Sequence, residues 1–218
     1  MKNFKKAFFS FLLCSCLLAA LLLAGGCKTG GTSSDASGAS TFTAVVIDAS
    51  DSGLLIAAQG KDFDLARVDY AAGYTPDFAV KPMQTVTLTV GALARETYPV
   101  GLTATAVTLT ADVGAAAPVI AQSAAAGLMQ VASPTILDVR TDAEYVTGHI
   151  DGALLLPYDQ IASLAPAQLP DKNVLLLTYC RTGARSAAAA KTLISMGYTR
   201  VFDMGGIVSW TGETVMGE

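Results

Sequence analysis

The sequence predicts an α/β domain with a parallel sheet covered by helices on both faces, preceded by a small all-β domain. Residues 41–113 consist of short runs in which Thr and Val recur at a period of two, which is typical of strands. Residues 117–218 alternate between strand-like and helix-like segments. The segment "GAAAP" at 114–118 lies where the pattern changes and has the composition of a joint.

The first 40 residues have the composition of an export signal and a tether. Three lysines within residues 1–6 precede an uncharged apolar run at 7–26, so a signal peptide is predicted over 1–26. Residues 27–40 are rich in Gly, Ser and Thr and are predicted to form a flexible tether. An uncleaved transmembrane anchor is the alternative, because about 18 to 20 apolar residues can span a bilayer. Both interpretations place the body of the protein outside the cytoplasm.

The apolar run ends in "LLAGGC", which resembles the lipobox of bacterial lipoproteins. This resemblance implies that Cys27 carries the lipid. It also implies a lipoprotein anchored to the outer face of the cytoplasmic membrane, or one in the periplasm. Ala24 departs from the leucine that is usual three residues before the lipidated cysteine.

Five strand-like runs, separated by the turn segments "DASDSG" and "GYTPD", predict a small antiparallel sheet or an OB-like barrel over 41–113. The segment carries four basic residues and eight acidic ones. The basic residues are Lys61, Arg67, Lys81 and Arg95, and the acidic ones are Asp48, Asp51, Asp62, Asp64, Asp69, Asp77, Glu96 and Asp112. Because nucleic-acid backbones require the opposite charge, nucleic-acid binding is not expected.

The α/β domain at 117–218 shows strand and helix signals in alternation. The predicted elements are a helix at 120–131, a strand at 135–139, a helix beginning at Thr141, an apolar segment at 153–157, a strand at 173–179, a helix from about 186 to 196 and a last strand at 200–204. Strands that alternate with helices in this way favour a parallel sheet.

Cys180 is predicted to be the free thiol of the mature protein. Cys14 and Cys16 leave with a cleaved signal, and Cys27 is acylated if the lipobox is used. Exported proteins usually pair their cysteines or avoid them, so an unpaired one is a candidate for chemistry. A buried, inert cysteine is the alternative.

The position of Cys180 indicates a reactive loop. It follows an apolar strand directly, and in open α/β sheets such loops lie beyond the carboxyl ends of the strands. The backbone amides of residues 181–186, the start of the next helix and the guanidinium groups of Arg181 and Arg185 all favour an anion. We therefore expect an accessible cysteine with a thiolate that acts as a nucleophile.

The segment "CRTGARS" resembles the active-site loop of the single-domain rhodanese-like sulfurtransferases. "ILDVRTDAEYVTGHIDGALLLP" (136–157) and "GYTRVFDMGGIVSW" (197–210) match two further motifs of that family in the expected order, so the likeness spans about 118–218. It implies a rhodanese-like fold in which Cys180 is catalytic and carries a sulfane sulfur as a persulfide. The substrate-binding residues that it implies are Arg181, Thr182, Gly183, Ala184, Arg185 and Ser186.

The partners implied are a small anionic sulfur donor such as thiosulfate and a thiol or cyanide-like acceptor, with no cofactor. Arg181 and Arg185 are expected to attract the sulfonate end of the donor. One histidine, His149, and one free cysteine cannot supply the four ligands of a metal site, so no metal is expected. The sequence gives no signal for an oligomeric state.

Three other functions are open. Cysteine phosphatases, including those that share the rhodanese fold, have five residues between cysteine and arginine, whereas four separate Cys180 from Arg185. A non-catalytic binding module with this fold would have no need of Cys180 and both arginines. A redox lipoprotein would require a partner thiol, because the mature chain has no second free cysteine.

Structural roles are expected for four other polar residues. His149 is expected to order a turn, while Asp138 and Arg140 form a salt bridge at a strand end. Glu144 suits the first turn of a helix, where negative charge is stabilised.

Overall fold

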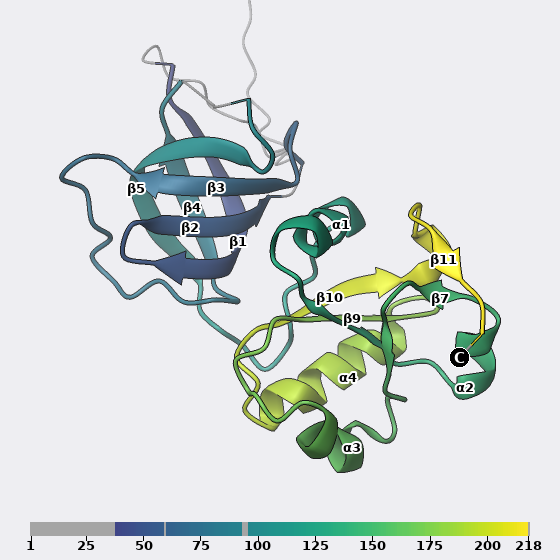
Figure 1. The fold of residues 1–218 in the computed structure, drawn as a ribbon. Helices are drawn as coiled ribbons and strands as arrows, with labels where there is room; N and C mark the ends of the chain where they lie inside the picture. Colours follow the sequence, from purple (N-terminus) through teal and green to yellow (C-terminus); the bar gives the residue numbers. More distant parts are fainter. Residues whose placement is uncertain (1–37, 59, 93–95, 218) are drawn as a thin grey trace, which may run out of the picture. The chain divides into compact units, whose positions relative to one another are not determined.

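A computed structural model describes residues 38–58, 60–92 and 96–217 (Figure 1). The predicted signal peptide, Cys27 and the tether up to residue 37 lie outside the described residues. None of the helices in the described ranges is long and apolar enough to span a membrane.

Residues 40–111 form a closed barrel of five strands. The strands are β1 (Ser40–Ser50), β2 (Gly53–Ala58), β3 (Leu65–Tyr70), β4 (Thr85–Val90) and β5 (Val100–Ala111), in the order β1-β2-β3-β5-β4. The five predicted strands are confirmed. Of the two predicted forms, an antiparallel sheet or a barrel, the structure has the barrel, in which β3 pairs with β5 in parallel. In the closed barrel, β5 lies between β3 and β4. These two strands run in opposite directions, so β5 can be antiparallel to only one of them. The OB-like identity stays a prediction.

The alternation of threonine with valine or leucine in the sequence accounts for the apolar interior of the barrel. In β4, Val86, Leu88 and Val90 are buried, while the threonines between them are partly exposed. Successive side chains of a strand point to opposite faces, so the Thr-Val pattern places valine and leucine inside. This explains why the period of two predicted the strands correctly.

The α/β part holds a four-stranded parallel sheet in the order β10-β9-β6-β8. Its elements are α1 (Gln122–Val131), β6 (Thr135–Asp138), α2 (Asp142–Val146), β7 (His149–Ile150), β8 (Leu154–Leu155), α3 (Ile161–Gln168), β9 (Leu176–Cys180), α4 (Ala184–Ser195), β10 (Val201–Gly206) and β11 (Thr214–Val215). A short 3-10 helix, Ile207–Ser209, follows β10. The predicted parallel sheet is confirmed.

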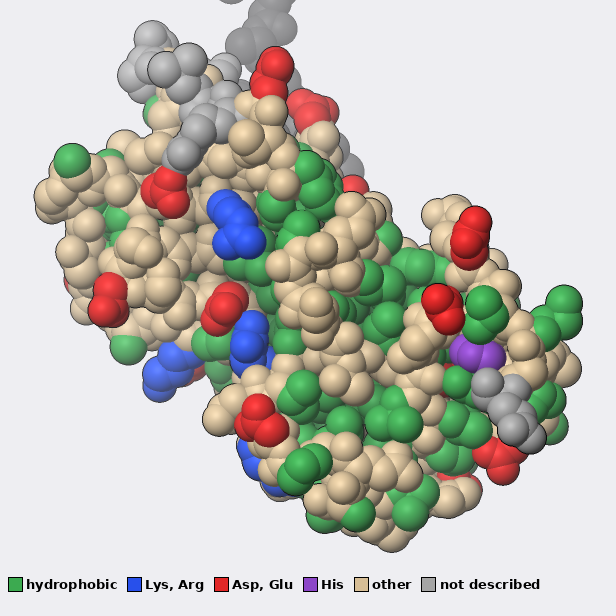
Figure 2. All heavy atoms as spheres, viewed as in Figure 1, with side chains coloured by type: hydrophobic (Ala, Val, Ile, Leu, Met, Phe, Trp, Pro, Cys, Tyr) green, Lys and Arg blue, Asp and Glu red, His purple; other side chains and the backbone are tan. Residues whose placement is uncertain are grey.

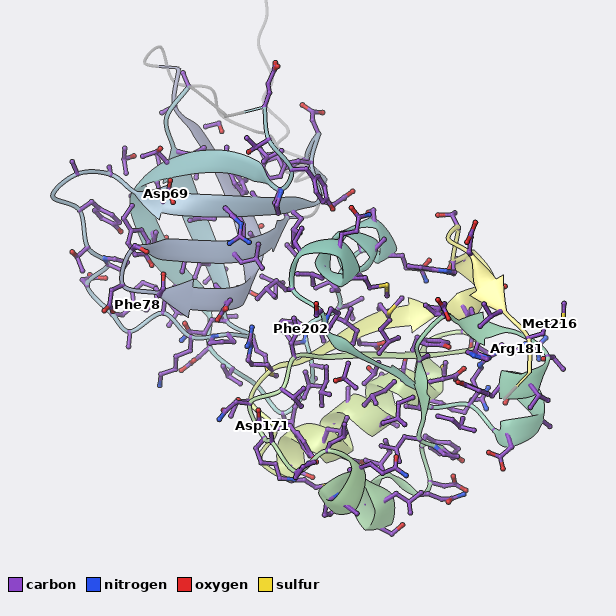
Figure 3. All side chains as sticks on the ribbon, viewed as in Figure 1. Asp69, Phe78, Asp171, Arg181, Phe202 and Met216 are labelled. Atoms are coloured by element: carbon purple, nitrogen blue, oxygen red, sulfur yellow. The ribbon has the colours of Figure 1, made fainter. Side chains whose placement is uncertain are left out.

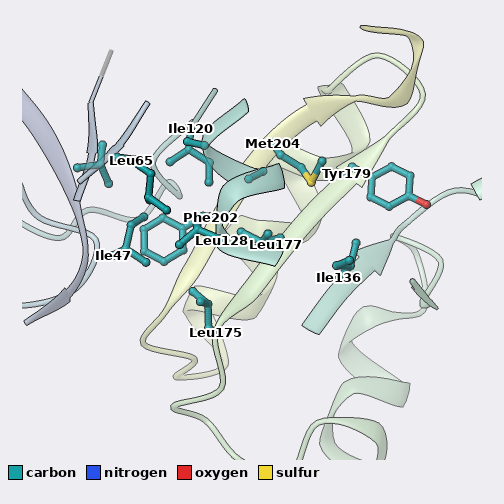
Figure 4. Close-up of a cluster of buried hydrophobic side chains, with 14 of the residues drawn as sticks. Ile47, Leu65, Ile120, Leu128, Ile136, Leu175, Leu177, Tyr179, Phe202 and Met204 are labelled. Carbon is teal, nitrogen blue, oxygen red and sulfur yellow. The ribbon is translucent and has the colours of Figure 1, made fainter. Parts of the chain in front are cut away.

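Helices cover both faces of this sheet. On one face, Leu128 of α1 belongs to the same buried cluster as Leu177 and Phe202 of the sheet (Figure 4). On the other face, Ile161 of α3 and Leu193 of α4 belong to a second buried hydrophobic cluster, which also contains residues from the strands of this sheet. Successive residues of β9 thus point to opposite helical layers, which makes the strand apolar along its length.

Candidate active site

Cys180 is the last residue of β9, which lies in the middle of the sheet between β10 and β6. Residues 181–183 lead directly into α4. The predicted position at the carboxyl end of a parallel strand is therefore confirmed. The sulfur faces the amino end of a twelve-residue helix, where amide groups and the positive end of the helix dipole favour an anion.

Helix α4 begins two residues earlier than the sequence predicted. Gly183 is its N-cap and has a φ of 109°, a left-handed conformation that favours glycine. Because Gly183 adopts this conformation, the chain turns within the few residues after Cys180 and the helix starts at Ala184. Arg185, which we expected in the loop before the helix, and Ser186, which we expected at the helix start, both belong to its first turn.

The thiol of Cys180 lies within a group of hydrogen-bond donors. The amide of Gly183 donates to its sulfur at 3.1 Å. Burial opposes ionisation, but the amides of Ser186, Gly183 and Thr182, together with the Ser186 hydroxyl, outweigh it and lower the pKa of Cys180 below its ordinary value. The largest of these favourable contributions come from backbone amides, which the sequence analysis placed around the sulfur together with the two arginines.

The expectation of an accessible Cys180 is wrong, because this residue is only 1% exposed. The loop that follows Cys180 and strand β10 approach each other closely at this point. A Cβ at Gly206, which pairs with Cys180 in the sheet, would lie 2.6 Å from the carbonyl oxygen of Arg181. Only glycine at this position lets the two segments approach so closely.

Arg185 is held by an acidic side chain from α2. Both of its terminal nitrogens donate to Glu144, each at 2.6 Å. The hydrogen bond from Arg185 lowers the pKa of Glu144 to about 2, against the opposing effect of burial. Glu144 in turn raises the pKa of Arg185, and interaction with Cys180 adds to that shift. Arg185 therefore lies between a carboxylate and the sulfur.

Glu144 does occupy the predicted first helical turn. It completes a capping box with Thr141, which accepts from the Glu144 amide at 3.4 Å. Its pairing with Arg185 was not predicted. The two residues lie 41 positions apart in the sequence, and a local sequence pattern cannot predict such a contact.

The other predicted binding residues divide by exposure. Arg181, Thr182 and Ala184 are exposed at the rim of the loop (Figure 3 labels Arg181), whereas Ser186 is buried. The amide of Val208 donates to the carbonyl of Arg181 at 3.3 Å, and the Val208 side chain is exposed. Figure 2 shows that apolar side chains (green) also reach the surface on the side of the molecule that it presents. The rim thus combines charged and apolar groups.

Asp203, at a buried position of β10, was not predicted as a site residue. Its carboxylate accepts from the Ser186 hydroxyl at 2.7 Å and from the Gly205 amide at 2.9 Å. The segment containing Asp203 was interpreted only as a strand. A charged residue within an apolar strand, followed by two glycines, was the available signal.

The expected salt bridge between Asp138 and Arg140 is present and buried. Arg140 also donates to the carbonyl of Gly148 at 2.7 Å. The hydroxyl of Tyr179 donates to Asp138 at 2.8 Å and accepts from the Ile150 amide at 3.1 Å. This network fixes the strand ends next to Cys180.

His149 lies in β7, and its ring stacks on Tyr145 with a centroid distance of 3.6 Å. Its Nδ1 atom lies 3.1 Å from the carbonyl oxygen of Tyr145. These contacts agree with the structural role that the sequence indicated. In the described ranges, no group of three or more His, Cys, Asp or Glu side chains is arranged to hold a metal ion.

Comparison with known proteins identifies relatives of the α/β part. The family model for the rhodanese-like domain matches residues 121–213. The thiosulfate sulfurtransferase PspE of Escherichia coli is 35% identical over 71 residues, which cover 33% of this chain and 68% of PspE. A sulfurtransferase of Allochromatium vinosum is 42% identical over 77 residues, covering 34% of this chain and 69% of that protein.

Solved structures match the same part of the chain. A rhodanese with anions from E. coli is 32% identical, with a TM-score of 0.37, and the match covers 38% of this chain and 99% of that one. A rhodanese-like domain protein from Staphylococcus aureus is 30% identical, with a TM-score of 0.40, covering 46% of this chain and 99% of the other. With two sulfurtransferases matched over two thirds of their length, the chain belongs to the rhodanese-like family.

Proposed function

We propose that this protein is an extracytoplasmic sulfurtransferase that carries a sulfane sulfur on Cys180. The relatives named as sulfurtransferases support sulfur transfer in general. The donor is proposed to be a small anion such as thiosulfate, and the acceptor a thiol or cyanide-like nucleophile.

The proposed reaction has two steps. In the first, the Cys180 thiolate attacks the sulfane sulfur of thiosulfate, the sulfur–sulfur bond of the donor breaks, and sulfite leaves with the bonding electrons. In the second, the acceptor attacks the outer sulfur of the persulfide and Cys180 leaves as a thiolate. The first step starts from a thiolate and ends with an anionic persulfide, and the second step returns the negative charge to the sulfur of Cys180. An anion is therefore present at this site throughout the cycle, and preorganised donors stabilise it without rearranging.

The observation that supports this proposal most strongly is the environment of the sulfur. The Gly183 amide lies 3.1 Å from it, and the surrounding amides lower the pKa of Cys180 in spite of burial. A thiolate, rather than a thiol, is the species that attacks sulfur donors. An inert core cysteine would have a raised pKa instead.

Steady-state sulfur transfer from thiosulfate to cyanide tests the proposed activity, with Cys180→Ser as the matched variant. We expect thiocyanate formation with the wild type and none above background with the variant. Equal rates for both proteins would refute Cys180 as the carrier.

A non-catalytic binding module is the second candidate, and the 1% exposure of Cys180 is the observation that favours it. In that case the wild type would bind thiosulfate or sulfite without turnover. A phosphatase ranks lower, since four residues separate Cys180 from Arg185 where the phosphatase loop has five. Hydrolysis of an aryl phosphate that requires Cys180 would reverse this order.

The extracytoplasmic location and the lipid anchor are proposed from residues 1–27. Expression in a bacterial host with a labelled fatty acid tests the anchor. We expect the label and membrane association with wild-type protein, and loss of the label with Cys27→Ala. Label retained in the variant would rule out Cys27 as the lipidation site.

A further inference from the structure

The hydroxyl of Ser186 has more acceptors than protons. Ser186 is fully buried, and its Oγ atom lies 2.8 Å from the Gly183 carbonyl, 2.7 Å from the Asp203 carboxylate and 3.4 Å from the Gly205 carbonyl. Ser186 also helps to lower the pKa of Cys180, through its amide and its hydroxyl. A serine hydroxyl has a single proton to donate, so these acceptors compete for it.

Among the acceptors of the Ser186 hydroxyl, the Asp203 side chain is the carboxylate, whereas the other two are backbone carbonyls. It is 4% exposed, and its Oδ1 atom also accepts from the Gly205 amide at 2.9 Å. In the sheet it pairs with Thr178, two residues before Cys180 on the adjacent strand. Hydrogen bonds to a carboxylate are shorter and stronger than those to neutral acceptors. Asp203 is therefore the strongest of these acceptors for the proton of Ser186.

We infer that Asp203 is a positioning residue of the sulfur site, whose buried carboxylate holds the Ser186 hydroxyl and so weakens the stabilisation of an anion on Cys180. The inference rests on the proposed function, in which Cys180 carries the sulfur.

The charged groups on the elements around Cys180 support a specific effect of Asp203. They are Arg181 and Arg185 from the loop and α4, Glu144 from α2, Asp203 from β10, and the Asp138–Arg140 pair from β6. The Glu144 and Asp138 carboxylates are each paired with an arginine. The Asp203 carboxylate accepts hydrogen bonds from a hydroxyl and an amide, and neither of these groups carries a positive charge.

The two half-reactions respond in opposite directions to this effect. A thiolate that is less stabilised is more nucleophilic, and it is also a poorer leaving group. In charging, Cys180 is the nucleophile and sulfite leaves. In discharge, Cys180 is the leaving group. Asp203 therefore speeds the attack of ionised Cys180 on the donor and slows release of the sulfur to the acceptor.

Asp203→Asn in the full-length chain tests the inference, because asparagine keeps an acceptor oxygen for Ser186 and Gly205 but removes the charge. We expect the pKa of Cys180, titrated by thiolate absorbance, to fall by about one unit. At a pH where both proteins are ionised, single-turnover charging by thiosulfate should slow about threefold, and discharge to cyanide should become faster. Asp171→Asn, an exposed site before the amino end of β9, is the matched control and should change neither rate.

Equal pKa values and equal half-reaction rates in Asp203→Asn and the wild type would overturn the inference. Parallel slowing of both half-reactions would also overturn it, because a merely structural role predicts that result. If the wild type takes up no sulfur, the proposed function fails, while the pKa comparison still decides the role of Asp203.

If Asp203→Asn does not fold, carbon-13 NMR of the Asp203 carboxyl group in the wild type tests the inference instead. We expect its resonance to shift as Cys180 is titrated, because the carboxyl holds the Ser186 hydroxyl. A resonance that stays unchanged throughout that titration would contradict the inference.

Discussion

Glu144 and Arg185 form a bidentate ion pair, with both oxygen–nitrogen distances at 2.6 Å, between α2 and the first turn of α4. Arg185 also interacts with the sulfur of Cys180. A cation that interacts with the sulfur of Cys180 is therefore shared with a carboxylate. The charge that a donor meets at this side of the loop depends on Glu144 as well as on Arg185.

Glu144→Gln should lower the KM for thiosulfate. The substitution removes a negative charge that repels a dianionic donor, and it frees the guanidinium of Arg185 to bind the sulfonate. We expect a decrease of about three- to tenfold at low ionic strength, which becomes smaller as salt is added. Steady-state kinetics at several salt concentrations measures this effect.

Asp142→Asn is the matched control for that experiment, since Asp142 is an exposed acid in the same helical turn. It should change KM far less. A KM that rises in Glu144→Gln would mean that Glu144 orients Arg185 productively, contrary to this prediction.

The same ion pair makes the stability of the fold depend on pH. The pKa of Glu144 is about 2 in the folded protein and 4.5 ordinarily, so the pair stabilises the fold fully above 4.5 and loses that contribution as the pH falls towards 2. The effect is modest, because both side chains are more than a quarter exposed.

Urea unfolding of the wild type and Glu144→Gln, at about pH 6 and about pH 3, checks this sign. The difference in unfolding free energy between the two proteins should shrink at the lower pH. A difference that grows on acidification would show that the pair is not the source of this stability.

Tyr179→Phe should destabilise the protein by about 1–3 kcal/mol. The lost hydroxyl donates to Asp138 and accepts from the Ile150 amide, and both groups are buried. Burial also raises the pKa of Tyr179, so the hydroxyl stays protonated as a donor. Tyr158→Phe, at a residue that is 44% exposed, serves as control in equilibrium unfolding. Equal stability of the two variants would contradict this account of the network.

The strands were predictable because their patterns are local. Alternation at a period of two located β4, and the apolar run before Cys180 located β9. Three short elements were missed. Helix α3 has eight residues and contains Pro166, which obscures a helical pattern, and the two-residue strands β7 and β11 pair across more than 60 positions. Such pairing is decided by tertiary contacts rather than by propensity.

The site could be predicted in part. The composition of the loop placed a reactive cysteine among amides, and the structure confirms the position of Cys180 and the Gly183 contact. Exposure of the sulfur was predicted wrongly, because the close approach of Gly206 to the loop depends on the neighbouring strand. The partners Glu144 and Asp203 come from other elements, so sequence spacing could not assign them.

The mass of the intact protein after incubation with thiosulfate tests the central claim most directly. We predict that the wild type gains one sulfur atom, that Cys180→Ser gains none, and that cyanide removes the added sulfur. Wild-type protein of unchanged mass, or an equal gain in Cys180→Ser, would contradict the account of Cys180 as a sulfur carrier.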